Sequence, residues 1–237
     1  MSKIHLHIAN ANQNFTAREL SIFKNAAKKA EAFIFAIFQQ FDYEVDIIIT
    51  TPSFILPTIA EDGIAGKILH SRLIVLSIDK QQRKISEDFV FETICHEMSH
   101  SLRWEKLPEY AETMFDGMIL EGLAVVLEEE AMVKTGRQDK QFFLKEMQKT
   151  PQAEIDKMIA VLKDKLEGKV YDYNKIFFTG DDILLRWAGY RLGYYFVKQY
   201  LRQTDQNIVQ ATLASYKDLL YKLKSPHRDM RNDEDEM

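Results

Sequence analysis

Residues 86–104 read SEDFVFETICHEMSHSLRW, and this stretch has the pattern of an amphipathic helix. Ser86 can cap the first turn, where two acidic residues follow it. At 100° per residue, one stripe of the helix is apolar and consists of Phe91, Ile94, Cys95, Met98 and Leu102. His96 and His100 lie nearly opposite that stripe. We therefore predict a helix with one face in the core and its two histidines facing a cleft.

The five residues 96–100, HEMSH, match the pattern H-E-x-x-H. Positions i and i+4 of a helix lie on one face, so the two imidazoles can bind one Zn²⁺. Glu97 lies between them and can act as a general base toward a water molecule on the metal. Because so short a pattern also arises by chance on helix surfaces, the zinc hypothesis calls for a third ligand.

A candidate third ligand lies in residues 118–128, MILEGLAVVLE. The apolar stripe of this second helix consists of Ile119, Leu123, Val126 and Leu127. Glu121 points away from the stripe, and Gly117 and Gly122 would allow another helix to approach closely. These features predict Glu121 as a metal ligand. The alternative is a solvated acidic face, since residues 128–130 are all Glu, and Glu128 either supports a ligand or lies at the surface.

Farther from the H-E-x-x-H helix, the pattern changes to strands. Residues 45–50 (VDIIIT) and 69–79 (LHSRLIVLSID) have strand composition, and the alternating His5 and His7 indicate an N-terminal strand. A long helix is predicted from a cap at Thr16 to Phe41, and the pattern is helical from Ser86 nearly to the end. We therefore predict an α+β fold, with a small mixed β-sheet in the N-terminal third followed by a mainly helical body.

Composition limits the class of protein. The 237 residues fit one domain, predicted over residues 1–224, and the charged residues 225–237 (SPHRDMRNDEDEM) predict a disordered tail. A net charge of −5 argues against binding to nucleic acid. The most apolar window, residues 30–41, is too short to cross a bilayer, which argues against a membrane. With one cysteine, Cys95, and no signal-peptide pattern, we predict a cytoplasmic protein.

Four segments together resemble a known family. They read GIAGKILHSRLIVLSID, TICHEMSHSLRW, ILEGLA and WAGYRLGYYFVKQYL, and they span about residues 60–205. The chain resembles the gluzincin clan of zinc metallopeptidases, and is more specifically similar to an uncharacterised bacterial family of predicted zinc-dependent proteases. The resemblance implies a zincin-like fold, a zinc site of His96, His100 and Glu121, and Glu97 as base and acid. It also implies an edge strand over residues 72–79 that pairs with an extended substrate peptide.

The sequence departs from the gluzincin pattern at one position. Several gluzincins place an Asp four residues after the ligand Glu, where it orients the first His, but this chain has Val125 there. Either Glu128 takes over this supporting role or the support is absent.

Hydrolysis also needs a donor for the oxyanion that develops on the attacked carbonyl. The candidates are Tyr190, Tyr194 and Arg103. The alternative for the two tyrosines is a core stripe, because aromatic residues recur at helical spacing in residues 187–201. Arg103 could equally form a salt bridge at the surface.

The sequence thus predicts a zinc-dependent metallohydrolase, a peptidase that acts on peptides or proteins through a Zn-bound water activated by Glu97. The alternative is a non-catalytic binding module with a structural or regulatory zinc site. In that case a fourth protein ligand, from Glu128 or Glu112, would close the coordination sphere.

Overall fold

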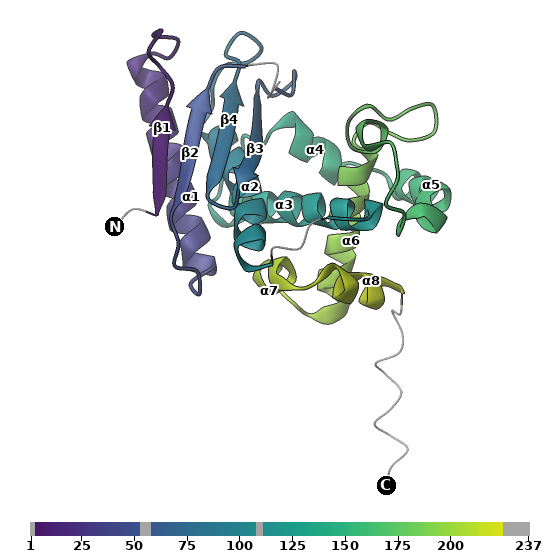
Figure 1. Cartoon of the computed structure of the whole chain (residues 1–237). Helices are drawn as coiled ribbons and strands as arrows, with labels where there is room; N and C mark the ends of the chain where they lie inside the picture. The colour runs from purple at the N-terminus through teal and green to yellow at the C-terminus, as the bar shows by residue number, and fades with distance from the viewer. Residues whose placement is uncertain (1–2, 53–57, 108–110, 225–237) are drawn as a thin grey trace. The chain divides into compact units, whose positions relative to one another are not determined.

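The computed structural model describes residues 3–52, 58–107 and 111–224 (Figure 1). The chain divides into two compact units, residues 1–110 with 124–151 and residues 111–123 with 152–237. Each unit is described below by itself. The expectation of a single domain over residues 1–224 stays a prediction, and the predicted tail, residues 225–237, lies outside the described residues.

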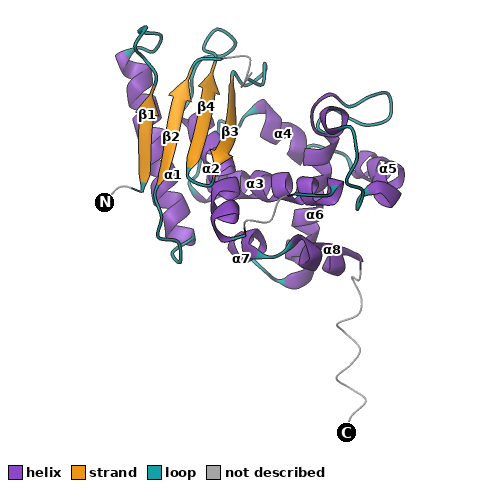
Figure 2. Ribbon diagram, in the orientation of Figure 1, coloured by secondary structure: helices purple, strands orange, loops and turns teal. Residues whose placement is uncertain are grey.

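The first unit contains a four-stranded sheet in the order β1-β2-β4-β3 (Figure 2). The strands are β1 Ile4–Ile8, β2 Val45–Thr50, β3 Ile64–His70 and β4 Leu73–Ile78. β1, β2 and β4 run parallel, and β3 runs antiparallel to β4. The α+β prediction of a small mixed sheet followed by a mainly helical body is therefore confirmed.

Two strands occupy the segment that the sequence predicted as one. β3 ends at His70 and β4 begins at Leu73, so the predicted strand over residues 69–79 contains the last two residues of β3, a two-residue turn and the whole of β4. The β3 pattern was hidden because Gly66 interrupts its apolar residues. Since β4 lies between β2 and β3, the expected edge strand at residues 72–79 is wrong, and β3 is the edge strand.

The register of the β3–β4 hairpin places one face of β3 toward the core. Ile64, Gly66 and Ile68 pair with Ile78, Leu76 and Ile74 of β4, whose side chains are buried. Directly opposed residues point to the same face of a sheet. The register shifts between Ile68 and His70, so Leu69 is an extra residue in a β-bulge.

Helices α1 (Ala17–Ile37) and α2 (Glu87–Lys106) pack against each other and against the sheet (Figure 1). As predicted, α1 begins after Thr16, whose hydroxyl accepts the Glu19 backbone N–H at 3.3 Å. The Ser86 hydroxyl accepts the Asp88 backbone N–H at 3.2 Å and caps α2. α1 ends at Ile37, four residues before the predicted end. The predicted apolar stripe of α2 is confirmed, because all five of its side chains are fully buried.

Helix α3 (Met114–Lys134) is buried nearly all round, and α4 (Phe142–Gln148) follows it. The predicted stripe of α3 is buried, but Ala124 and Val125, which lie outside that stripe, are also fully buried. The expectation of a one-sided amphipathic helix was therefore wrong. Apolar residues surround α3, and a helix of this kind belongs to the interior of a protein.

The second unit is built around α6 (Ala188–Thr204), which contacts α5 (Gln152–Leu162), α7 (Ile208–Leu213) and α8 (Tyr216–Lys224). Residues 163–165 form a 3₁₀ turn and residues 175–179 form a π-helical turn. The predicted close approach of a second helix at Gly122 is confirmed. A Cβ at Gly122 would lie 2.2 Å from the backbone carbonyl carbon and oxygen of Gly193 in α6, and one at Gly193 would lie 1.9 Å from the Met118 carbonyl oxygen.

Gly193→Ala is expected to destabilise the protein, because the added methyl group meets backbone atoms that cannot rotate away. The intrinsic gain of alanine over glycine in a helix is about 1 kcal/mol. We expect overpacking to outweigh it, with a net loss of about 1–3 kcal/mol in unfolding free energy. Urea denaturation measures the effect. Gly117→Ala is the control with a smaller expected loss, since its nearest neighbour is the Phe177 side chain at 3.1 Å. Equal stability of the two variants would contradict the expectation.

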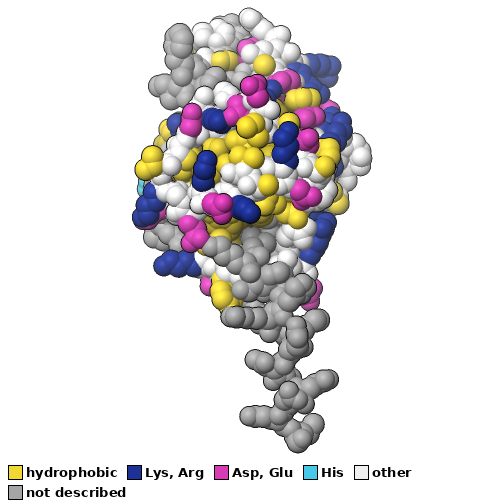
Figure 3. Space-filling model, turned by 90° about the vertical axis from the view of Figure 1, so that its right-hand side faces the viewer, with side chains coloured by type: hydrophobic (Ala, Val, Ile, Leu, Met, Phe, Trp, Pro, Cys, Tyr) yellow, Lys and Arg dark blue, Asp and Glu magenta, His cyan; other side chains and the backbone are white. Residues whose placement is uncertain are grey.

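The surface is mixed in character. On the face shown in Figure 3, hydrophobic side chains lie among Lys, Arg, Asp and Glu side chains. In the second unit the exposed large hydrophobic residues include Val170, Tyr173, Phe178 and Ile183. Among the described residues, no helix combines the length and the apolar character that crossing a membrane requires.

Candidate functional site

Helix α2 carries the H-E-x-x-H residues and brings the two histidines together, as their spacing predicts. The rings of His96 and His100 have centroids 5.0 Å apart at an interplanar angle of 77°. The His96 side chain is 12% exposed and His100 is 8% exposed, so both imidazoles are largely shielded from water. An imidazole pair in this position can present two nitrogen ligands to one metal ion.

Glu121 of α3 completes a group of three side chains with metal-binding chemistry. His96, His100 and Glu121 each offer one ligand atom, and these atoms all lie within 4.8 Å of one another. Two nitrogens and one carboxylate oxygen form a donor set that suits zinc. The three residues that the sequence predicted as ligands thus form a possible metal-binding group.

Glu128 of α3 supports the first of these histidines. Its Oε2 atom lies 2.8 Å from His96 Nδ1. A carboxylate at Nδ1 favours the tautomer with its proton there, which leaves Nε2 with a lone pair for a metal. Burial raises the pKa of Glu128, and the His96 imidazole lowers it again. Glu128 therefore contacts His96 in a way that Val125 cannot, because a valine side chain has no hydrogen-bonding group. Val125 itself is fully buried.

Glu97, the residue after the first histidine, is only 5% exposed. It lies against β3, where a Cβ atom added at Gly66 would come within 2.4 Å of Glu97 Cγ. The negative charge of Glu97 also raises the pKa of Glu128, after larger effects of burial, of the His96 imidazole and of Asp62. Glu97 is thus largely enclosed by other residues of the first unit. The role of Glu97 as the base stays a prediction.

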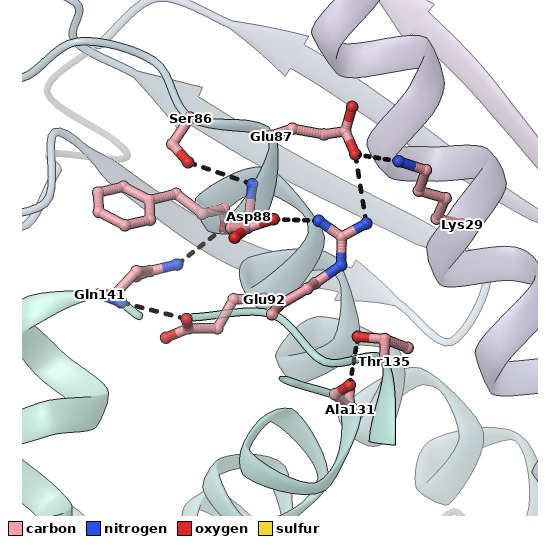
Figure 4. A network of polar contacts seen from close by, with 10 residues as sticks. Lys29, Ser86, Glu87, Asp88, Glu92, Ala131, Thr135 and Gln141 are labelled. Carbon is pink, nitrogen blue, oxygen red and sulfur yellow. Dashed lines mark hydrogen bonds and ion pairs between the residues drawn. The ribbon is translucent and has the colours of Figure 1, made fainter. Parts of the chain in front are cut away.

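Glu92 is a buried acid that the sequence analysis did not identify. It lies one helical turn before His96 and is 1% exposed. Its Oε2 atom accepts the backbone N–H of Gln141 at 3.1 Å (Figure 4). Within the described residues, Oε1 of Glu92 and Oε1 of Glu128 are buried without a hydrogen-bond partner. Burial, and after it the charge of Glu128, raises the pKa of Glu92 well above its ordinary value of 4.5.

The raised pKa of Glu92 predicts a pH dependence of stability. Above about pH 4.5 the unfolded chain releases a proton that folded Glu92 keeps, so the unfolding free energy falls as the pH rises toward the raised pKa. Glu92→Gln removes this proton uptake. In zinc-free protein we expect the variant to be more stable at pH 8, by on the order of 1 kcal/mol, and less sensitive to pH between about 5 and 8.

Urea denaturation at several pH values measures this effect. Glu105→Gln in the same helix is the control, because hydrogen bonding to Arg72 lowers the pKa of Glu105. Its substitution should therefore act with the opposite sign and cost stability at neutral pH. A Glu92→Gln variant with the wild-type pH profile would contradict the expectation.

The three predicted oxyanion donors lie in α2 and α6. Arg103 is 2% exposed, so it is not the surface residue that the alternative described. Tyr190 packs edge-on against Phe177, with ring centroids 5.7 Å apart, and belongs to an aromatic cluster of the second unit. Tyr194 lies beneath the Lys198 ammonium group, 5.6 Å from the ring centroid. The catalytic roles of Arg103, Tyr190 and Tyr194 stay predictions.

Tyr173 is a further aromatic residue that the sequence analysis missed. Its ring stacks on Phe177 at a centroid distance of 4.7 Å and an angle of 25°. Tyr173 is 48% exposed, and its partial burial raises its pKa, which the charge of Glu121 raises further. Residues 168–182 have no regular hydrophobic period, so no sequence pattern pointed to Tyr173.

Comparison with known protein families gives a match to this chain. The model of a family described as "Predicted Zn-dependent protease" matches residues 23–221 of the chain. This range contains the whole of α2 and α3, and therefore all three residues of the possible metal-binding group. No curated protein and no solved structure matches the chain.

Proposed function

The chain belongs to this family of predicted Zn-dependent proteases, and from that premise we propose that it is a zinc-dependent peptidase of the gluzincin type with a zincin-like fold. The observation that carries the proposal is the convergence of ligand atoms from His96, His100 and Glu121 within 4.8 Å of one another. In catalytic zinc sites three protein ligands of these types leave a coordination position open.

In this proposal, different side chains of the chain bind the metal, transfer the proton and stabilise the oxyanion. When bound, Zn²⁺ supplies a Lewis acid that polarises a carbonyl group and makes water more acidic. Glu97 takes the proton of the attacking water and passes it to the leaving amine. Glu128 holds His96 in the orientation and tautomer that a metal ligand needs, which the 2.8 Å contact supports. One of Tyr190, Tyr194 and Arg103 donates a hydrogen bond to the oxyanion.

The edge strand β3 would bind the substrate. Within the described residues, the side of β3 that faces away from β4 is bridged only at Ile64, by Ile59. Backbone N–H and C=O groups at a sheet edge can pair with an extended peptide, which then lies as a further strand. Because β3 also lies against Glu97, a peptide added there would run close to the proposed base.

The alternative of a closed, structural zinc site needs a fourth protein ligand. The sequence suggested Glu128 or Glu112 for this position. Glu128 directs one carboxylate oxygen to His96 Nδ1, and Glu112 forms an ion pair with Lys169. Glu112 is thus paired elsewhere and the Oε2 atom of Glu128 is bound to His96, and this supports an open, catalytic site over a closed one.

Metal content and hydrolysis of the purified wild type test the proposal together. We expect about one zinc per chain by mass spectrometry and cleavage of peptides from a fluorogenic library. Phenanthroline should abolish the cleavage, and added Zn²⁺ should restore it. Circular dichroism at each step separates the two functions, because a structural zinc site would unfold when the metal is removed. Zinc binding without cleavage of any library peptide would count against a peptidase.

A further inference from the structure

The backbone of β3 at Gly66 lies in direct contact with the side chain of Glu97. A Cβ atom at Gly66 would lie 2.4 Å from Glu97 Cγ, 2.5 Å from Oε1 and 2.7 Å from Cδ. Contacts below 3.0 Å essentially do not occur for real Cβ atoms. Any side chain at position 66 would therefore force Glu97, or the strand itself, to move.

The space at Gly66 interrupts an otherwise apolar face. Gly66 pairs with Leu76, and its two neighbours on the same face of β3 are Ile64 and Ile68. An isoleucine or valine would be the ordinary residue at such a position. The carboxylate of Glu97 lies where that side chain would be, and Glu97 is only 5% exposed. The missing side chain of Gly66 thus makes room for a charged group beside an apolar layer.

Backbone conformation does not explain the glycine. The glycines with positive φ are Gly63, Gly136 and Gly180, so position 66 does not need the left-handed region that favours glycine. Glycine within a strand lowers stability, because it loses more backbone entropy on folding and has no side chain to pack. The feature that position 66 does need is space, and Glu97 fills it.

From these contacts we infer that Gly66 is a positioning residue for Glu97, with the bare β3 backbone setting where the carboxylate lies. The part of this inference that concerns catalysis rests on the proposed peptidase function. A methyl group at position 66 would displace the carboxylate from its place against β3 without changing its charge. The ligands His96, His100 and Glu121 would keep their metal.

A double-mutant cycle on the zinc-free protein tests the contact without any assay of activity. The four proteins are wild type, Gly66→Ala, Glu97→Ala and the double variant. In wild type, Gly66→Ala should lower the thermal midpoint by about 3–8 °C, because the added methyl group overpacks the contact with Glu97. In the Glu97→Ala background the methyl group has space, so the same substitution should leave the midpoint unchanged or raise it.

Activity and zinc content then test the positioning role. Gly66→Ala should keep one zinc per chain and lower kcat by about 10-fold to 100-fold, with little change in KM, since misplacement of about 1 Å costs on this scale. The control is Lys28→Ala, which alters the exposed face of α1, outside β3 and α2, and should leave kcat, KM and zinc content unchanged.

The outcomes separate this inference from the proposed function. Equal midpoint shifts in the two backgrounds would overturn the contact, and wild-type kcat in Gly66→Ala would overturn the positioning role. If Gly66→Ala fails to fold but the double variant folds, the contact is supported, whereas failure of both overturns it. If the wild type cleaves no peptide, the proposed function fails, and the cycle still decides whether Gly66 and Glu97 are coupled.

Discussion

Glu97→Gln is expected to bind zinc as the wild type does and to hydrolyse peptides about 10²–10⁴-fold more slowly. Glutamine keeps the size and burial of the side chain, which is 5% exposed, but cannot accept the proton of an attacking water. The loss should therefore appear in kcat, and the metal ligands should be unaffected. Steady-state kinetics and zinc content of the same preparation measure both.

The control for Glu97→Gln is Glu105→Gln. Glu105 lies in the same helix and pairs with Arg72, so the charge change is the same at a place away from the histidines. This variant should hydrolyse peptides at the wild-type rate. Near-normal hydrolysis by Glu97→Gln would remove Glu97 from the mechanism.

Glu121→Ala is expected to lose most of its zinc when purified without added metal, against about one zinc per chain in the wild type. The substitution removes one of the three side chains whose ligand atoms converge within 4.8 Å. Glu128→Gln should have an intermediate effect, with zinc affinity lower by about 10-fold to 100-fold, because it weakens the contact at His96 Nδ1.

The third variant of this series is Glu130→Ala in the same helix. Glu130 pairs with Lys134 one turn later, so its loss should not change zinc content. The expected order of zinc loss is thus Glu121→Ala, then Glu128→Gln, then Glu130→Ala. A Glu121→Ala protein with a full complement of zinc would exclude Glu121 as a ligand.

Local periodicity was sufficient to predict α2, because a helix that buries one stripe repeats its apolar residues in a regular way. The cap at Ser86, the buried stripe and the shared face of His96 and His100 were all predicted from residues close in sequence. The candidate ligand Glu121 also came from a local argument about its helix. Its convergence with the histidines depends on packing, which the sequence pattern alone does not contain.

Elements whose environment is set by distant residues were harder to predict. β3 was missed because Gly66 breaks the apolar alternation, and the reason for that glycine, Glu97, is 31 residues away. Glu92 lies four residues before His96, on the same helix face as both histidines, and this position can be predicted from the sequence. Its burial depends on packing against other elements, which the sequence pattern does not contain. The role of Glu128 at His96 likewise became visible only with the 2.8 Å contact.

The β-bulge at Leu69 has a consequence for how insertions and deletions would act on this protein. Deletion of Leu69 with the turn kept in place would remove the bulge, because Ile68 and His70 would become neighbours opposite Ile74 and Leu73, and the pairing of residues 64–68 with β4 would stay the same. Deletion of Lys67 with Ile68 kept opposite Ile74 would instead place Ala65 opposite Leu76 in place of Gly66, because side chains in a strand alternate between faces. The hairpin can thus lose its extra residue without a change of register, whereas the length of the paired part of β3 is as constrained as the identity of the residues beside Glu97.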